Sequence, residues 1–149
     1  MMRARRASLL LLGVLATLLL AVPAQAQFRS KASIRTGIET SLLQQRQAMA
    51  NLQEQRPERA LALIWEAYVN LRAAHGNITA NNEAAKYPDP VFKIQNERIE
   101  RARARLLQAR DLLRDIVAKQ WVGENGIQRV REFLAEALRE TEVVSALTL

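Results

Sequence analysis

IERARARLLQARDLLRDI, residues 99–116, is the most regular segment of this chain. Its apolar side chains recur every three or four positions, which places them on one stripe of a helix. The stripe consists of Ile99, Ala102, Leu106, Ala109, Leu113 and Ile116. Charged side chains cover the remaining surface, with arginines on both flanks of the stripe. This pattern is typical of an amphipathic helix that packs its apolar face against other helices.

Two helices are predicted before this segment and one after it, and alternating strand patterns are absent. The first covers about residues 31–55, with Gln45 interrupting its apolar stripe. That stripe contains Ile34, Ile38, Leu42, Met49 and Leu52. The second begins at Pro57 and reaches about His75, with Gly76 as the predicted stop. Its buried face is predicted to contain Leu61, Ile64, Trp65, Tyr68 and Leu71.

The last helix is predicted to follow a capping box made by Asn125 and Gln128. Its stripe contains Ile127, Val130, Phe133, Leu134, Ala137, Leu138, Thr141 and Val144. Two short connections between helices favour antiparallel neighbours around one core. The predicted fold class is therefore all-α, with four antiparallel amphipathic helices in a helical bundle and a loop at residues 76–89.

The third predicted helix contains residues 99–116. It would begin at Asp89 and Pro90, where a capping carboxylate precedes a proline, and reach about Trp121. A helix of about 32 residues is roughly 48 Å long. Because this helix would be much longer than the second one, one of its ends should project or meet a second copy. A homodimer is therefore one predicted assembly.

Residues 1–26 have the pattern of a cleaved signal peptide. Arg3, Arg5 and Arg6 precede an apolar run over residues 9–22, and an Ala-Gln-Ala site ends at Ala26. The run has fourteen residues, whereas a membrane-spanning helix needs about 20, so an uncleaved anchor is the weaker alternative. We expect a mature single domain over residues 27–149, located in the periplasm or secreted.

Composition excludes several classes of site and function for the mature chain. It has no cysteine, which excludes disulfides, thiolate metal sites and cysteine nucleophiles. Three of the 22 basic residues lie in the leader, so 19 basic and 15 acidic residues remain, a net charge of +4. That charge allows only weak contact with an anionic membrane surface or wall polymer. Export makes a nucleic-acid partner unexpected.

The arginines of the third predicted helix allow two interpretations. Arg103, Arg110 and Arg114 lie on one flank of its stripe. They could simply cover the edge of the stripe while their guanidinium groups stay in water. Alternatively, they could form a cationic ridge for an acidic partner. Glu132, Glu136 and Glu140 of the last helix are predicted to be a solvated face, with weak calcium binding or pairing to arginines of a neighbouring helix as the alternatives.

The segment from Tyr87 to Phe92 combines two aromatic residues with two prolines. A stiff segment loses little entropy on docking, and aromatic side chains favour interfaces. Tyr87 and Phe92 are therefore candidate interaction residues. The favoured interpretation, however, is that both side chains fold back and plug the end of the bundle.

No arrangement in the sequence indicates catalysis. His75 is the only histidine and is predicted to cap a last helical turn, which leaves no metal site and no histidine base beside a serine. No cofactor is expected. The sequence thus predicts an exported, non-enzymatic helical protein that acts by protein–protein interaction in the bacterial cell envelope. The alternatives are a periplasmic chaperone-like holder of unfolded proteins and an electrostatic binder of anionic lipid or cell-wall polymer.

Overall fold

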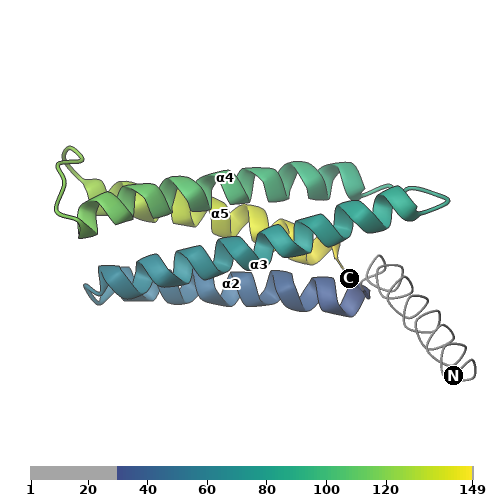
Figure 1. The fold of residues 1–149 in the computed structure, drawn as a ribbon, viewed down its shortest axis with the longest axis horizontal. Coiled ribbons are helices and arrows are strands. Elements are labelled where there is room, and N and C mark those ends of the chain that lie inside the picture. Colours follow the sequence, from purple (N-terminus) through teal and green to yellow (C-terminus); the bar gives the residue numbers. More distant parts are fainter. Residues whose placement is uncertain (1–29, 149) are drawn as a thin grey trace, which may run out of the picture.

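The structure is a computed structural model that describes residues 30–148 (Figure 1). It contains four α-helices: α2 (Lys31–Gln53), α3 (Pro57–Ala84), α4 (Phe92–Val117) and α5 (Gly126–Leu147). The described residues contain no strand. The predicted all-α fold with four helices is confirmed. The predicted leader, residues 1–26, lies outside the described part of the chain.

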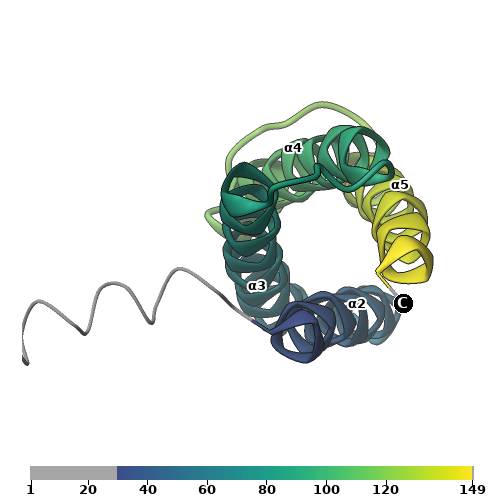
Figure 2. The ribbon, with the colours of Figure 1, turned by 90° about the vertical axis from the view of Figure 1, so that its right-hand side faces the viewer.

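The four helices form a closed ring. Each of α2 and α4 contacts both α3 and α5, and Figure 2 shows this order in a view along the helices. In Figure 1 the α2–α3 and α4–α5 connections lie at one end of the bundle, and the α3–α4 connection lies at the other. This second end, which we call the α3–α4 end, also holds the first turn of α2 and the last turn of α5.

The core lies along the axis of this ring and is built from the predicted stripes. Ile99, Leu106 and Leu113 of α4 are fully buried, together with the alanines between them. The other three helices contribute Ile38, Ile64, Leu71, Val130, Leu134 and Val144, which are also fully buried. Burial of apolar surface contributes about 25 cal/mol per Å². Packing of these stripes is therefore the main stabilising interaction in a domain without disulfides.

Gln45, which interrupts the apolar stripe of α2 in the sequence, lies inside this core. Its side chain is fully buried, and its Nε2 donates to Ser41 Oγ at 3.2 Å and to Thr141 Oγ1 at 3.1 Å. Ser41 Oγ in turn donates to the carbonyl oxygen of Ala67, and Thr141 Oγ1 donates to that of Ala137. These hydrogen bonds form a polar layer that joins α2, α3 and α5.

The predicted stop at Gly76 is wrong, and so is the predicted loop at residues 76–89. Helix α3 continues to Ala84, which shortens the connection to residues 85–91. The apolar stripe continues past the glycine, because Ile78 follows Leu71 and Ala74 at helical spacing and is buried. Burial of Ile78 outweighs the cost of one glycine inside a helix, about 1 kcal/mol.

The ends of the next two helices also differ from the prediction. Helix α4 begins at Phe92 rather than Pro90 and ends at Val117 rather than near Trp121. It has 26 residues and α3 has 28, so the length difference that suggested a second copy is absent. The predicted capping box is wrong as well. Asn125 has a left-handed backbone (φ 58°) and makes no side-chain capping bond, since such a cap needs an extended backbone.

Candidate functional site

The two candidate aromatic residues, Tyr87 in the connection over residues 85–91 and Phe92 directly after it, differ in exposure. Tyr87 is 79% exposed. Phe92, at the first position of α4, is partly buried and packs against the core. The prediction that both side chains plug the bundle therefore holds for Phe92 alone, because only Phe92 belongs to the helix whose apolar stripe faces the axis.

Hydrogen bonds hold the backbone of this loop in place. The backbone N–H of Asp89 donates to Asn82 Oδ1 at 3.3 Å, and that of Val91 donates to Asp89 Oδ1 at 3.0 Å. The Phe92 N–H donates to the Asp89 carbonyl at 3.0 Å. Pro88 and Pro90 each restrict one further backbone angle. Tyr87 is thus displayed on a restrained loop.

Arg103 faces α3 rather than solvent. Its Nη1 donates to His75 Nδ1 at 2.8 Å, and its guanidinium carbon lies 5.6 Å from the centroid of the Tyr68 ring. Because arginine can only donate, His75 Nδ1 is the acceptor and Nε2 carries the hydrogen. Nε2 then donates to Asn96 Oδ1 at 2.6 Å. The prediction that His75 caps a last turn is wrong, since α3 continues beyond it and the imidazole is buried.

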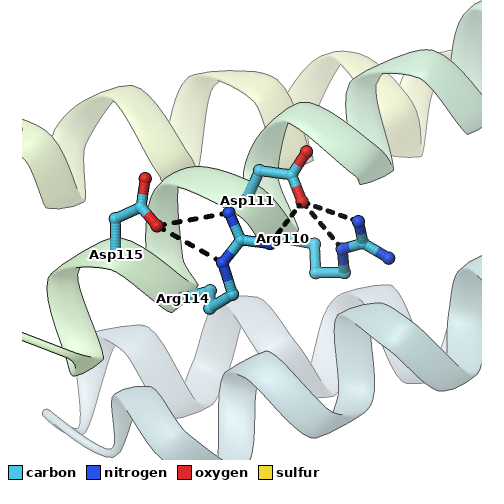
Figure 3. A network of polar contacts seen from close by, with 4 residues as sticks. All are labelled: Arg110, Asp111, Arg114 and Asp115. Carbon is cyan, nitrogen blue, oxygen red and sulfur yellow. Dashed lines mark hydrogen bonds and ion pairs between the residues drawn. The ribbon is translucent and has the colours of Figure 1, made fainter.

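Arg110 and Arg114 pair with acidic residues of their own helix, as Figure 3 shows. Arg110 Nη2 lies 2.7 Å from Asp111 Oδ1. Arg114 lies 3.3 Å from Asp115 Oδ1 and 3.5 Å from Asp111 Oδ1. Exposed pairs of this kind contribute about 0–1 kcal/mol to stability. They also reduce the positive charge that a cationic ridge would present.

Trp65 and Tyr68 were both predicted to be buried, but the structure shows that they differ in exposure. Their rings stack with centroids 5.4 Å apart, yet Tyr68 is buried and Trp65 is 44% exposed. The Arg110 guanidinium carbon lies 4.9 Å from the Trp65 ring centroid, a cation–π distance. Trp65 and Arg110 line a shallow hollow between α3 and α4 with Glu58, Leu61, Ala62 and Arg114. Sequence reasoning missed this hollow because its lining residues, 58–65 on α3 and 110–114 on α4, are distant in the chain.

Of the glutamates Glu132, Glu136 and Glu140 on α5, the last two pair with arginines of α4, which confirms the pairing alternative rather than the solvated face. Glu140 lies 3.1 Å from Arg98 and 3.4 Å from Arg101, and Glu136 pairs with Arg105. Glu132 is exposed and accepts a hydrogen bond from Gln128. The ion pairs of Glu136 and Glu140 lie across the α4–α5 contact and support it.

Within residues 30–148, no three His, Asp or Glu side chains come close enough to hold a metal ion. No helix in this range combines the length and apolar character needed to span a bilayer. Comparisons with protein-family models, curated proteins and solved structures find no match to this chain. Any functional conclusion therefore depends on the residues themselves.

Proposed function

We propose that this chain is an exported, antiparallel four-helix protein of the bacterial cell envelope that works by binding another envelope protein and has no enzymatic activity. It would reside in the periplasm or be secreted. The observation that carries the proposal is the restrained loop over residues 85–91, which displays Tyr87 to solvent. The leader pattern of residues 1–26 supports export.

Contacts between helices support the antiparallel arrangement. Tyr68 of α3 meets Arg103 of α4, whereas Trp65, earlier in α3, meets Arg110, later in α4. Between α4 and α5, Arg98 pairs with Glu140 and Arg105 pairs with Glu136. In both contacts the residue number rises along one helix as it falls along the other.

The loop has the properties of a protein-binding element. A tyrosine supplies a large contact area with two rotatable side-chain bonds, and aromatic residues often dominate binding energy at interfaces. The backbone bonds at Asp89 and Val91 already order the loop, so docking loses less conformational entropy than it would for a mobile segment. The exposed side chain of Tyr87 does not stabilise the core. Contact with a partner protein therefore explains a tyrosine at this position better than folding does.

Site-specific photocrosslinking in the native envelope tests the proposal. A photoreactive phenylalanine analogue at position 87 should give one discrete crosslinked product. The same analogue at Gln53, exposed at the end of α2, should give none. Equal labelling at both positions, or no product at position 87, would count against the loop as the binding element.

Stability measurements provide the matched control. Tyr87→Ala should change the free energy of unfolding by less than about 0.5 kcal/mol, because an exposed side chain is removed. Phe92→Ala should cost about 1–3 kcal/mol, since a side chain packed on the core is truncated. If Tyr87→Ala were as destabilising as Phe92→Ala, Tyr87 would be a structural residue. Suppression of aggregation, or vesicle binding that fades as salt rises, would instead favour the chaperone or the electrostatic alternative.

A further inference from the structure

We infer that the α3–α4 end of the bundle carries a binding site for a small, uncharged and mainly apolar molecule. A cavity of about 570 Å³ lies there between the ends of all four helices and the loop over residues 85–91. Ligand sites in proteins typically measure about 300–1,000 Å³. This inference does not depend on the proposed protein partner.

The cavity exists because α3 is longer at this end than its neighbours. Figure 1 shows the end of α3 and the loop after it reaching beyond the near ends of α2, α4 and α5. The wall that the end of α3 forms therefore has no helix facing it that would fill the cavity. Tyr87, the largest side chain of the loop, lines the cavity but remains 79% exposed and does not close it.

The walls are held in place by polar contacts that do not need a ligand. The Asn82 side chain binds the backbone of Asp89 and fixes the loop against α3. Gln95 of α4, which also lines the cavity, is only 5% exposed. Its Nε2 donates to the Leu147 carbonyl at 3.2 Å and to Thr148 Oγ1 at 3.3 Å. These bonds fix the end of α5 against α4, so the cavity is largely preformed.

The sequence of the overhanging turns is unfavourable for a helix. Residues 76–82 read GNITANN, and glycine, asparagine and threonine all have low helix propensity. Two asparagines of this segment, Asn81 and Asn82, line the cavity. Side-chain amides at these positions provide hydrogen-bonding groups that alanine, a better helix former, would lack. Helix stability does not account for this choice: the Asn82 side chain holds the loop through Asp89, and both asparagines line the cavity.

The lining indicates the chemical class of the ligand. Ile34, Ile78, Phe92 and Leu147 provide apolar walls, and Asn81, Asn82 and Gln95 provide amides. The charged lining residues are Lys31 and Asp89, whose opposite charges cancel. Transfer of a charged group into such a site costs free energy unless the group is paired. The site therefore favours an uncharged, mainly apolar molecule with one or two hydrogen-bonding groups.

Fluorescence titration of the purified full chain, produced by export with its own leader, tests the inference. The probe is N-phenyl-1-naphthylamine, which is uncharged and apolar. We expect saturable binding of one probe per chain. Ala85 lines the cavity at its exposed edge, so Ala85→Phe should fill part of the space and weaken binding at least tenfold. Ala80 is also exposed on α3 but lies outside the lining, and Ala80→Phe should bind within twofold of the wild type.

Two further measurements make the result decisive. Ala85→Leu adds a smaller side chain and should weaken binding to an intermediate degree, which separates filling of the cavity from misfolding. The sulfonated analogue 1-anilinonaphthalene-8-sulfonate should bind at least tenfold more weakly than the uncharged probe. Absence of saturable binding, equal binding by Ala85→Phe, or preference for the sulfonate would overturn the inference. Crosslinking at position 87 uses no probe, so failure of either experiment leaves the other interpretable.

Discussion

Arg103 contacts two side chains of α3, His75 and Tyr68, at the α3–α4 contact. It donates to the buried His75 Nδ1 and lies against the Tyr68 ring, while the other imidazole nitrogen is bonded to Asn96. Both imidazole nitrogens are therefore paired, whereas the Arg103 Nε is buried with no hydrogen-bond partner among the described residues. Loss of the arginine would leave a buried acceptor on His75 without a donor, which is more costly than loss of an exposed hydrogen bond.

Arg103→Met should therefore reduce the free energy of unfolding by about 1–3 kcal/mol. Arg114 is the matched control, because its ion pairs with Asp111 and Asp115 are exposed. Arg114→Met should change stability by less than about 0.5 kcal/mol. Urea denaturation followed by circular dichroism measures both values. Equal effects would show that Arg103 does not have the structural role that its contacts indicate.

Gln45 is a second residue whose contribution to stability depends on the hydrogen bonds around it. Its Nε2 makes two hydrogen bonds, but its Oε1 is buried with no hydrogen-bond partner among the described residues. Ser41 and Thr141 keep their own carbonyl acceptors without it. A buried unsatisfied oxygen costs about 1–3 kcal/mol, similar to the gain from two hydrogen bonds.

Gln45→Leu should therefore unfold within about 1 kcal/mol of the wild type, because the loss of two hydrogen bonds offsets the removal of the orphaned oxygen. Gln45→Glu should be destabilising by more than about 3 kcal/mol, since it buries a charge without a partner. Thermal denaturation at neutral pH compares the two variants. A large loss for Gln45→Leu would mean that the polar layer is a net stabilising feature.

At the scale of the helix, Gly76 and Gly126 differ in the space around them. Both lie within helices by their bounds. A Cβ at Gly76 would meet nothing within 4 Å, whereas one at Gly126 would lie 2.8 Å from Val122 Cγ2 and 3.0 Å from Ile116 Cδ1. The first glycine is thus tolerated inside α3, and the second allows the α4–α5 connection to approach α5 closely.

Gly76→Ala should stabilise the protein by about 0.5–1 kcal/mol, because alanine replaces glycine inside an exposed helical turn. Gly126→Ala should be destabilising, since the added carbon requires Val122 and Ile116 to move. Melting temperatures from circular dichroism show whether each substitution stabilises or destabilises the protein. An unchanged melting temperature for Gly76→Ala would show that residues near 76 are not stably helical in solution.

At the scale of the whole molecule, the four helices cover one another around a single ring. Helix lengths range from 22 to 28 residues, so none of α2–α5 leaves an extended apolar stripe uncovered, although the last turns of α3 reach beyond the other three helices. The homodimer that the sequence suggested was based on such a stripe. Exposed apolar residues such as Leu43 and Val143 are scattered over different helices, which is normal for the surface of a monomer.

We expect the purified chain to be monomeric at micromolar concentration. Size-exclusion chromatography with light scattering should give the mass of one chain, independent of protein concentration. A mass that doubles as concentration rises would support the homodimer instead. In that case, Trp65, which is half-exposed on α3, would be the first residue to replace by alanine, with Leu43→Ala as the control.

The sequence by itself determined that this domain is helical and identified many of its core residues, although Trp65 and Ile127, which were assigned to apolar stripes, are 44% and 36% exposed. Helical periodicity is a local property, so the stripe from Ile99 to Leu113 and its counterparts could be identified without knowing their neighbours. The candidate residues Tyr87, Phe92, Arg103, Arg110 and Arg114 could also be chosen from residue type and spacing, but their roles could not.

Only the tertiary structure decided where α3 ends, which arginine turns inward and where the cavity lies. Helix α3 continues past Gly76 because Ile78 is buried. Arg103 donates a hydrogen bond to His75 of α3, whereas Arg110 forms an ion pair with Asp111 of its own helix. Trp65 and Tyr68 lie at the edge of the same stripe, and the position of α4 decides which of them is covered. These outcomes depend on contacts between residues distant in the chain, whose free energies are comparable to the local preferences that they override.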